Sequence, residues 1–268
     1  MLINVLGIST NIKKITNYAK KRGIIVIEDN CEALGAKYEK KYLGTYGDFG
    51  TYSFFYSHQI TSGEGGMIVC NNQKDYEILL ALRSHGWSRG EKVYEKNAKK
   101  FPNLDPRYIF INSGFNLRPT DIQAAIASNQ FKRLDFFKKT RTMNKKKIIN
   151  ALKKDKRWND QFKFVKYSKK IDPSYMVLPI LLNEKFINKK NFFIKLIEKK
   201  GLETRPIISG SFVNQPSAKL YNLNPNKKKF IGAQKVQELG FVIGLHVKKI
   251  KQKQLKFIAE TLFSIEKI

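Results

Sequence analysis

The chain has 268 residues, of which 42% are hydrophobic, enough to bury the cores of one large or two modest domains, and this excludes a disordered tail. No apolar run approaches the roughly 18 residues of a membrane span, and the opening MLINVLGIST does not fit a signal peptide. The sequence therefore predicts a cytoplasmic chain with no membrane segment. The two cysteines, Cys31 and Cys70, lack the clustered spacing of a zinc or iron–sulfur site, so no metal is expected.

The formal net charge of +29 raises the hypothesis of nucleic-acid binding, because basic surfaces attract phosphates. Only nine of the 51 basic residues are arginine, the side chain that reads base edges best, and the lysines are spread from Lys13 to Lys267. A genome rich in A and T would encode many such lysines at solvent-exposed positions. We expect no nucleic-acid partner.

The first elements are a helix and a buried strand. Residues 10–22 carry apolar side chains at helical spacing and stop at Gly23. The continuous apolar run that follows, IIVIEDN, is typical of a strand buried on both faces, and therefore of a parallel sheet. The acidic pair Glu28 and Asp29 ends this strand, where open α/β sheets bind their ligands.

The rest of the chain alternates between further strands and helices. Residues 87–112 are polar and show no periodicity, as in a long functional or mobile loop. The sequence pattern changes near residue 140, which predicts two domains, at 1–140 and 141–268. The remaining predicted elements are strands at 51–57, 67–71, 173–182 and 202–208, and helices at 74–84, 119–154 with breaks, 186–200 and 251–266.

Several residue types that carry chemistry fall close together after the first strand. Asp29 and Glu32 follow it, Ser53 lies on the next strand, and His58 precedes the glycine-rich turn GEGG. Each has an ordinary structural explanation when taken alone. Asp29 can cap a turn, Ser53 can be a core hydroxyl, His58 can be a hydrogen-bonded loop residue, and the glycines can serve a tight hairpin.

Taken together, these residues resemble a known family. The matching segments are VIEDNCEALGAKYEKKYLGTYGDFGTYSFFYSHQITSGEGGMIVCN and SGFNLRPTDIQAA, with weaker likeness in ETRPIISGSF and GLH. They are similar to the pyridoxal-phosphate (PLP)-dependent sugar aminotransferases of the DegT/StrS type. The resemblance implies the aspartate-aminotransferase fold (PLP fold type I). This is an α/β large domain with a mixed, mostly parallel sheet, here incomplete, followed by a smaller C-terminal α/β domain.

One position departs from the family pattern. Where most members have the lysine that binds the cofactor covalently, this chain has His58, and imidazole forms no stable Schiff base. The change resembles a branch of the family, the 4-keto-6-deoxyhexose 3-dehydratases of deoxysugar and lipopolysaccharide biosynthesis. That branch implies PLP or pyridoxamine phosphate as cofactor, a nucleotide-linked 4-keto-6-deoxyhexose as substrate and L-glutamate as amino donor. An ordinary sugar aminotransferase is the alternative.

The resemblance also implies roles for individual residues. Asp29 would pair with the pyridine nitrogen, Glu32 would be a second acidic contact near the ring, and Ser53 would donate to the cofactor phosphate. Asn116 would reach the phosphate in a neighbouring subunit, which implies a homodimer with shared active sites. His58 would act first as a base and then as an acid.

Three further residues are candidates for contacts with the substrate. His85 would lie by the sugar, although a histidine before Gly86 can also serve a helix C-terminus. Arg205 would meet a diphosphate or the glutamate carboxylate, or else form a salt bridge. His246 corresponds to a histidine of the small domain.

Full-length relatives carry an N-terminal portion with a phosphate-binding loop that has no counterpart in this sequence. The expectation is a truncated or split reading frame, with weak cofactor binding. A third hypothesis follows, namely an inactive fragment or a structural partner for a separately encoded N-terminal half.

Overall fold

The computed structural model describes residues 1–88, 91–221 and 230–268. The chain forms two compact units, the first made of Met1–Leu134 with Lys170–Ser174, and the second of Asp135–Lys169 with Tyr175–Ile268. Each unit is described by itself below. The domain boundary near residue 140 stays a prediction.

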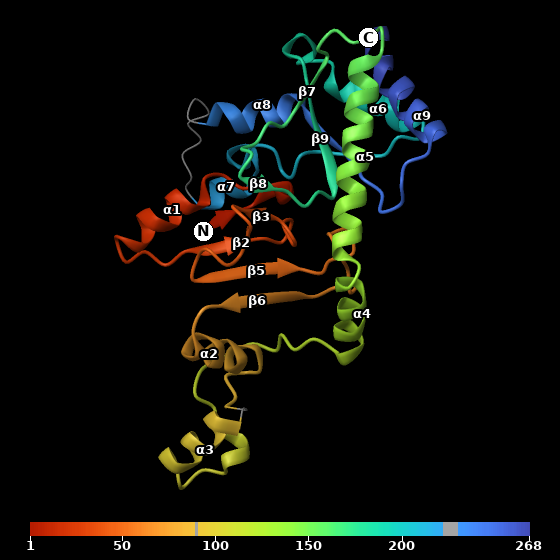
Figure 1. Ribbon diagram of the computed structural model, residues 1–268. Helices are drawn as coiled ribbons and strands as arrows, with labels where there is room; N and C mark the ends of the chain where they lie inside the picture. Colours follow the sequence, from red (N-terminus) through yellow and green to blue (C-terminus); the bar gives the residue numbers. More distant parts are fainter. Residues whose placement is uncertain (89–90, 222–229) are drawn as a thin grey trace. The chain divides into compact units, whose positions relative to one another are not determined.

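The first unit is built on a four-stranded sheet with the order β1-β2-β5-β6, in which β2, β5 and β6 run side by side in Figure 1. The pairs β1–β2 and β2–β5 are parallel and the pair β5–β6 is antiparallel, so the mixed, mostly parallel sheet is confirmed. The strands span Leu2–Ile3 (β1), Ile27–Asp29 (β2), Phe49–Ser53 (β5) and Gly66–Cys70 (β6).

The predicted first helix is confirmed as α1, Ile12–Lys20. The side chain of Asn11 caps it by accepting a hydrogen bond from the amide of Lys14, at 3.3 Å. Its buried Ile12 joins a core with side chains from the loop and strands that follow β2 and from β8. The members of this core are Ile12, Ala33, Ala36, Tyr38, Leu43 and Ile171.

A second, three-stranded sheet in this unit takes one strand from much later in the chain. Its order is β4-β3-β8, and its strands are Lys41–Tyr42 (β4), Lys37–Tyr38 (β3) and Ile171–Asp172 (β8). β3 pairs antiparallel with both neighbours. Residues 170–174 are therefore part of the first unit although residues 135–169 are not.

The turn at residues 44–47 is held by the buried carboxylate of Glu28. Its Oε2 accepts a hydrogen bond from the amide of Gly44 at 2.7 Å, and its Oε1 accepts from the amides of Tyr46 and Gly47, both at 2.6 Å. Glu28 has no exposed surface. Three charge-assisted hydrogen bonds therefore satisfy a carboxylate that would otherwise be costly to bury.

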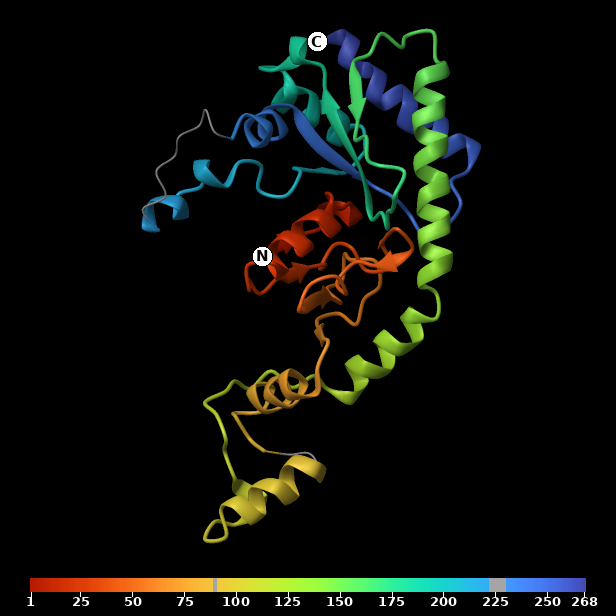
Figure 2. The same ribbon diagram turned by 60° about the vertical axis from the view of Figure 1, so that its left-hand side comes forward.

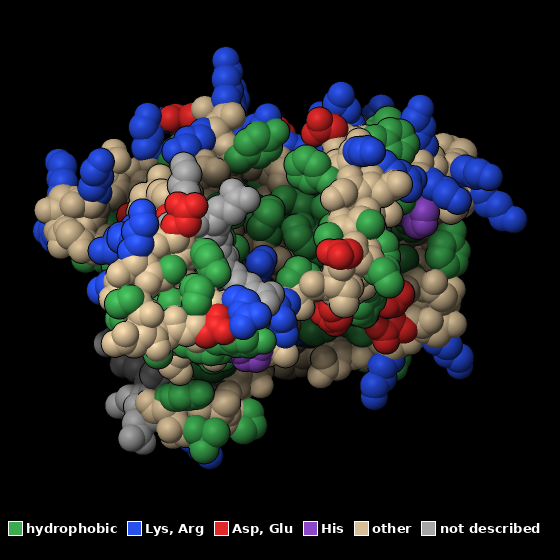
Figure 3. All heavy atoms as spheres, turned by 90° about the horizontal axis from the view of Figure 1, so that it is seen from below, with side chains coloured by type: hydrophobic (Ala, Val, Ile, Leu, Met, Phe, Trp, Pro, Cys, Tyr) green, Lys and Arg blue, Asp and Glu red, His purple; other side chains and the backbone are tan. Residues whose placement is uncertain are grey.

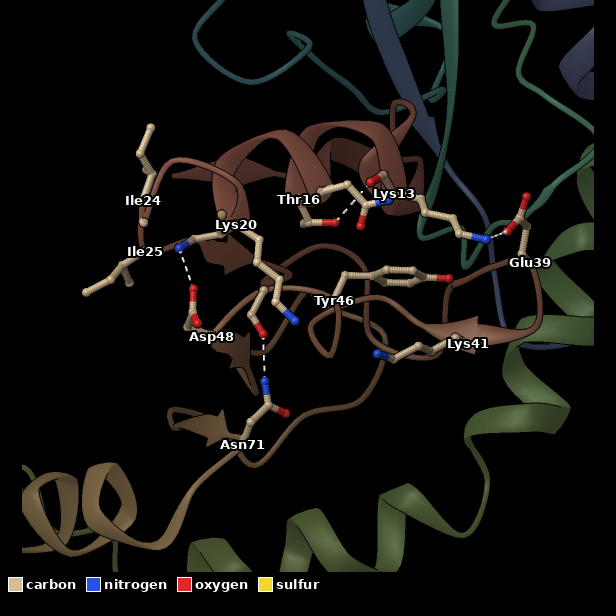
Figure 4. A pocket seen from close by; sticks show the side chains of 14 residues that line it. Lys13, Thr16, Lys20, Ile24, Ile25, Glu39, Lys41, Tyr46, Asp48 and Asn71 are labelled. Atoms are coloured by element: carbon tan, nitrogen blue, oxygen red, sulfur yellow. Dashed lines mark hydrogen bonds and ion pairs between the residues drawn. The ribbon is translucent and has the colours of Figure 1, made fainter.

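Glycine is required where this turn meets β5. A Cβ atom at Gly50 would lie 2.1 Å from the carbonyl oxygen of Gly44, and one at Gly44 would lie 2.2 Å from the hydroxyl of Tyr52. The turn and α1 line a cavity of about 710 Å³ at the amino ends of β2 and β5, where the side chains of Lys20, Lys41 and Tyr46 lie (Figure 4).

The segment after β6 is mostly helical. The predicted loop at 87–112 is wrong in part, because α3 occupies Glu91–Lys100 and a 3-10 helix follows at Pro106–Tyr108. Glutamate, lysine and alanine favour helix even without an apolar stripe, and this is why periodicity missed α3. Both views show α3 standing apart from the sheet of its unit (Figures 1 and 2). The flanking helices are α2, Gln73–Arg83, and α4, Asp121–Phe131.

The second unit is an antiparallel sheet with helices. Its order is β10-β11-β9-β7, and sequence analysis missed β11, the strand at the centre of its pairings. The predicted strands 173–182 and 202–208 are shorter than expected, at Val177–Leu182 (β9) and Thr204–Arg205 (β10). The other elements are β7 (Phe162–Phe164), β11 (Gly240–Gly244), α5 (Leu134–Lys154), α6 (Lys190–Lys199), α7 (Ser217–Leu220), α8 (Ile231–Leu239) and α9 (Gln252–Leu262).

Basic side chains protrude from many places on the surface drawn in Figure 3, with hydrophobic, acidic and other side chains between them. Within residues 1–88, 91–221 and 230–268, no helix combines the length and the apolar character that a bilayer crossing needs.

The Glu28 hydrogen bonds predict a large loss of stability when the carboxylate is changed. In Glu28→Gln, an amide group that cannot accept replaces one oxygen and leaves at least one buried backbone amide without a partner. We expect the free energy of unfolding to fall by about 3 kcal/mol in urea titrations followed by circular dichroism. Glu95→Gln, at an exposed position of α3, is the control. Equal stability of the two variants would contradict the prediction.

Candidate functional site

The predicted site residues Asp29, Ser53 and His58 lie at or just beyond the carboxyl ends of two parallel strands. Asp29 ends β2 and Ser53 ends β5. Asp29 is paired with Thr51, and Ser53 stands two residues further along β5. The side chains of Asp29, Thr51 and Ser53 therefore project from the same face of the sheet. Glu28, one residue earlier, projects from the opposite face. The site and the Glu28 turn thus use opposite faces of one strand.

Asp29 is half-buried, and its Oδ1 accepts a hydrogen bond from the amide of Cys31 at 3.0 Å. The thiol of Cys31 lies 3.9 Å from the hydroxyl of Thr51. Burial, together with Asp29, raises the pKa of this thiol to about 11. Cys31 is therefore a protonated neighbour of the carboxylate and not a nucleophile.

Glu32 performs a structural task at the same edge. Its Oε2 accepts a hydrogen bond from the amide of Leu6 at 2.9 Å. Leu6 and Gly7 both have left-handed backbone conformations, with φ of 55° and 75°. One carboxylate oxygen of Glu32 thus holds the strained turn that follows β1.

His58 lies in a turn and not on a strand. The predicted strand 51–57 is wrong beyond Ser53, because the Ser53 hydroxyl accepts the amide of Phe55 at 3.2 Å and bends the chain. The amide of His58 then donates to the carbonyl of Phe55 at 3.1 Å. The imidazole packs edge-on against the Phe55 ring, with 5.6 Å between centroids.

The electrostatic environment of His58 combines burial with negative charge. Burial lowers the pKa of the imidazole below its ordinary value. The carboxylates of Glu32 and Asp29 and the backbone of Ser53 oppose this shift without cancelling it. The buried Nδ1 atom has no hydrogen-bond partner among the residues that the structure describes. The neutral imidazole therefore presents an unengaged ring nitrogen.

The glycine-rich turn connects this edge to α4. The Ser62 hydroxyl donates to the carbonyl of Glu64 at 2.7 Å, and Gly63 and Gly65 have φ of 84° and 146°. Glycine is needed at Gly65, because a side chain there would be strained. The carbonyl of Glu64 also accepts from the side chain of Gln123 at 3.2 Å, which ties the first turn of α4 to this loop.

His85 and Asn116 are brought together in a second group of the first unit. The amide of His85 donates to the carbonyl of Phe115 at 2.7 Å, and Ser84 forms a bridge with Asn116. The Oδ1 atom of Asn116 accepts from Arg118 at 3.1 Å, which leaves its amide hydrogens as donors. Both side chains are exposed.

Arg205 and His246 belong to the second unit. Arg205 is exposed on β10, and its guanidinium lies 3.9 Å from Glu203. His246 follows β11, and its Nδ1 accepts the amide of Lys248 at 2.9 Å, so Nε2 carries the ring proton when the imidazole is neutral. The side chain of Asn144 on α5 donates to the carbonyl of His246 at 2.9 Å and fixes this segment.

The residues at the carboxyl edge fit a phosphorylated pyridine. Asp29 supplies a carboxylate for a ring nitrogen. Ser53 supplies a hydroxyl that accepts from Phe55 and still has its own hydrogen to donate. The buried Nδ1 of His58 is a polar atom to which no described residue makes a hydrogen bond. Within the described part of the chain, no cluster of three or more His, Cys, Asp or Glu side chains could hold a metal ion.

The sequence patterns did not predict the positioning roles of two residues at the carboxyl edge of the sheet. They indicated Glu28 only as part of an acidic pair, and they did not indicate Gln59. The strand alternation could have shown that Glu28 faces away from Asp29. No sequence signal indicated the partners of Gln59.

The chain resembles proteins of known function along most of its length. It is 30% identical over 248 residues to the GDP-4-keto-6-deoxy-D-mannose 3-dehydratase of Escherichia coli O55:H7, covering 92% of this chain and 62% of that protein. It is 31% identical over 207 residues to the GDP-perosamine synthase of Escherichia coli O157:H7, covering 77% of this chain and 50% of that protein.

A solved structure shares the fold. The E. coli GDP-4-keto-6-deoxy-D-mannose-3-dehydratase with bound hydrated PLP matches with a TM-score of 0.80 and 26% identity, over 97% of this chain and 66% of that one. The predicted PLP fold type I is therefore confirmed. The chain spans about half to two thirds of the length of these relatives. The model of the DegT/DnrJ/EryC1/StrS aminotransferase family matches residues 1–263, and the chain belongs to this family.

Proposed function

We propose that this chain takes part in the PLP-dependent removal of the C3 hydroxyl from a nucleotide-linked 4-keto-6-deoxyhexose, with L-glutamate as amino donor. The observation that carries the proposal is His58, a half-buried imidazole with an unengaged Nδ1 in electrostatic reach of Asp29 and Glu32. A lysine at this position would hold the cofactor covalently, whereas an imidazole is suited to proton transfer.

PLP is the cofactor of this family, and the first unit offers groups to hold it. Asp29 would pair with the protonated pyridine nitrogen, and the Ser53 hydroxyl would donate to the phosphate. When bound, the cofactor supplies an electron sink for carbanion chemistry. Asn116, whose Oδ1 accepts from Arg118, would use its amide hydrogens to add a phosphate contact in a neighbouring subunit. His85, Arg205 and His246 are proposed to contact the sugar nucleotide.

His58 would move a single proton twice. Burial keeps its imidazole neutral near pH 7, so that it can accept a proton from the carbon that bears the amine. The resulting imidazolium, favoured by Asp29 and Glu32, then delivers that proton to the departing C3 hydroxyl, which leaves as water. The two carboxylates thus stabilise the protonated state that the second transfer needs.

A sugar aminotransferase is the second candidate, because the chain is 31% identical to a GDP-perosamine synthase and 30% identical to a 3-dehydratase, although the first match covers 77% of this chain and the second 92%. An aminotransferase would retain the C3 hydroxyl and give an amino sugar. Mass spectrometry of the product separates the two reactions. His58 favours the dehydratase, because lysine is the residue that releases an amino-sugar product by exchange on the cofactor.

We also propose that a second copy of the chain covers α4 and the segment before it. None of the described side chains of α4 is buried. Its Ile122 is 74% exposed, and the preceding Phe115 and Leu117 are 64% and 66% exposed. Isolated apolar side chains are common on surfaces, but several strongly exposed ones within eight residues of sequence favour an interface. Asn116 lies within the same segment, as a shared active site requires.

Restoring lysine tests the role of His58. We expect His58→Lys to gain a covalent PLP adduct, seen as a visible absorbance band that borohydride reduces and fixes, and the unchanged chain to show none. Gln73→Lys, at an exposed position of α2, is the control for unspecific lysine modification. A borohydride-fixed adduct on the unchanged chain would contradict the dehydratase proposal.

The buried imidazole also predicts a pH dependence of stability. The pKa of His58 in the folded chain is below its unfolded value, so folding favours the neutral ring. This stabilisation is complete above the unfolded value of about 6.5 and is lost as the pH falls towards the folded pKa. The difference in unfolding free energy between the unchanged chain and His58→Gln should therefore shrink from pH 7.5 to pH 5.5. A difference that does not change with pH would exclude a buried, neutral His58.

The interface proposal predicts dissociation by a charge on α4. Ile122→Glu should weaken self-association by about 3 kcal/mol, roughly a hundredfold in Kd, because it removes an apolar contact and buries a carboxylate. Size-exclusion chromatography with light scattering measures the mass. Ile187→Glu, at an apolar position of the second unit that is 43% exposed, should leave the dimer intact. A monomeric unchanged chain would contradict the proposal.

A further inference from the structure

We propose that Gln59 is the positioning residue of His58, because its side-chain amide fixes the distance between the imidazole and the two carboxylates at the end of β2. The catalytic relevance of this inference rests on the role proposed for His58. The positional part does not, and it can be measured without cofactor or substrate.

Gln59 is held on both sides by backbone carbonyls. The residue is 1% exposed. Its Nε2 atom donates to the carbonyl of Glu32 and to the carbonyl of Ser174, the latter at 3.1 Å. Both hydrogens of the amide nitrogen are thus used, and the two acceptors lie in segments 27 and 115 residues away along the chain. A single side chain therefore joins the His58 turn to two separate loops.

The segments that Gln59 joins have little freedom to shift. The Glu32 loop is fixed by the hydrogen bond from Leu6 to the Glu32 carboxylate. The Ser174 segment packs directly on the turn after β1, where a Cβ atom at Gly7 would lie 2.1 Å from the Ser174 carbonyl oxygen. Ser174 also donates its amide to the carbonyl of Gly7 at 3.4 Å. Gln59 is anchored to a closely packed frame.

The imidazole of His58 has few contacts of its own. In the part of the chain that the structure describes, its Nδ1 has no hydrogen-bond partner, and the ring is held by the Ser53 backbone and by packing on Phe55. The position of the ring therefore depends on the backbone at residues 58 and 59. Since Gln59 ties that backbone to the Glu32 carbonyl, it sets how closely the imidazole approaches Glu32 and Asp29.

Two variants separate the hydrogen bonds from the shape of the side chain. Gln59→Met keeps the length and removes both donors, and Gln59→Glu keeps the shape but turns a carboxylate towards two carbonyls. The measurement is the titration of the His58 ring followed by NMR on the 268-residue chain. A loosened turn moves the ring away from the carboxylates, which lowers the midpoint, and lets water reach the ring, which raises it. Burial is the larger of the two causes, so with Gln59→Met we expect the midpoint to rise towards the ordinary value of 6.5. Gln59→Glu should raise it further by adding a nearby negative charge.

Asn97→Leu is the matched control for a general loss of stability. Asn97 is also buried, at 8% exposure, and donates to the hydroxyl of Ser88 at 2.6 Å within the same unit. This variant should lower the unfolding midpoint and leave the His58 titration unchanged. An unchanged titration in a folded Gln59→Met chain would overturn the proposal.

If neither Gln59 variant folds, a measurement on the unchanged chain still tests the inference. The two side-chain amide hydrogens of Gln59 should exchange slowly with solvent, and rapid exchange of both would overturn the inference. A shifted titration in Gln59→Met together with failure of the His58→Lys experiment would mean that the positioning is correct and the proposed reaction is not.

Discussion

The carboxylate of Glu28 is the constraint on which the first unit depends. By accepting three backbone amides from residues 44–47, it fixes which face of β2 is turned towards that turn. Strand geometry then sends the next side chain, Asp29, to the other face, beside Thr51 and Ser53. A shift of one residue in register would turn Glu28 away from the turn and Asp29 away from the site, so that neither carboxylate could make its present contacts. The carboxylate of Glu28, which holds the fold, thus determines the position of Asp29, the carboxylate of the candidate site.

The chemistry at the carboxyl edge of the sheet depends on which polar side chains are engaged in hydrogen bonds with the backbone. The carboxylates of Asp29 and Glu32 each accept one backbone amide and so serve the local fold. The Cys31 thiol, with its pKa raised to about 11, adds no charge. The buried Nδ1 of His58 has no hydrogen-bond partner among the described residues. The site therefore combines a rigid, negatively charged frame with a single neutral group that is able to exchange protons.

Sequence patterns predicted the elements with strong periodicity and the residues with a family resemblance. The apolar run before Asp29 indicated a parallel strand correctly, but the predicted burial on both faces is wrong, because Ile24, Ile25 and Ile27 are 52%, 66% and 40% exposed. The motif around Ser53 and His58 indicated the family. The helix at Glu91–Lys100 was missed because its surface is polar, and β11 was missed because its short apolar run resembles a helix end. The partners of Gln59 could not be predicted, since contacts between residues 59 and 174 leave no trace in local sequence.

The return of residues 170–174 to the first unit has a consequence for how the chain folds. β8 completes the small sheet with β3, and Ser174 closes the contact with Gln59, so the first unit is complete only after residue 174 has been synthesised. During synthesis on the ribosome, folding of the first unit cannot be completed until more than thirty residues of the second unit have emerged. Its edge strands are exposed during that interval, and loop closure over such a sequence separation is slow. Assembly of the two units is therefore interleaved in time and not sequential.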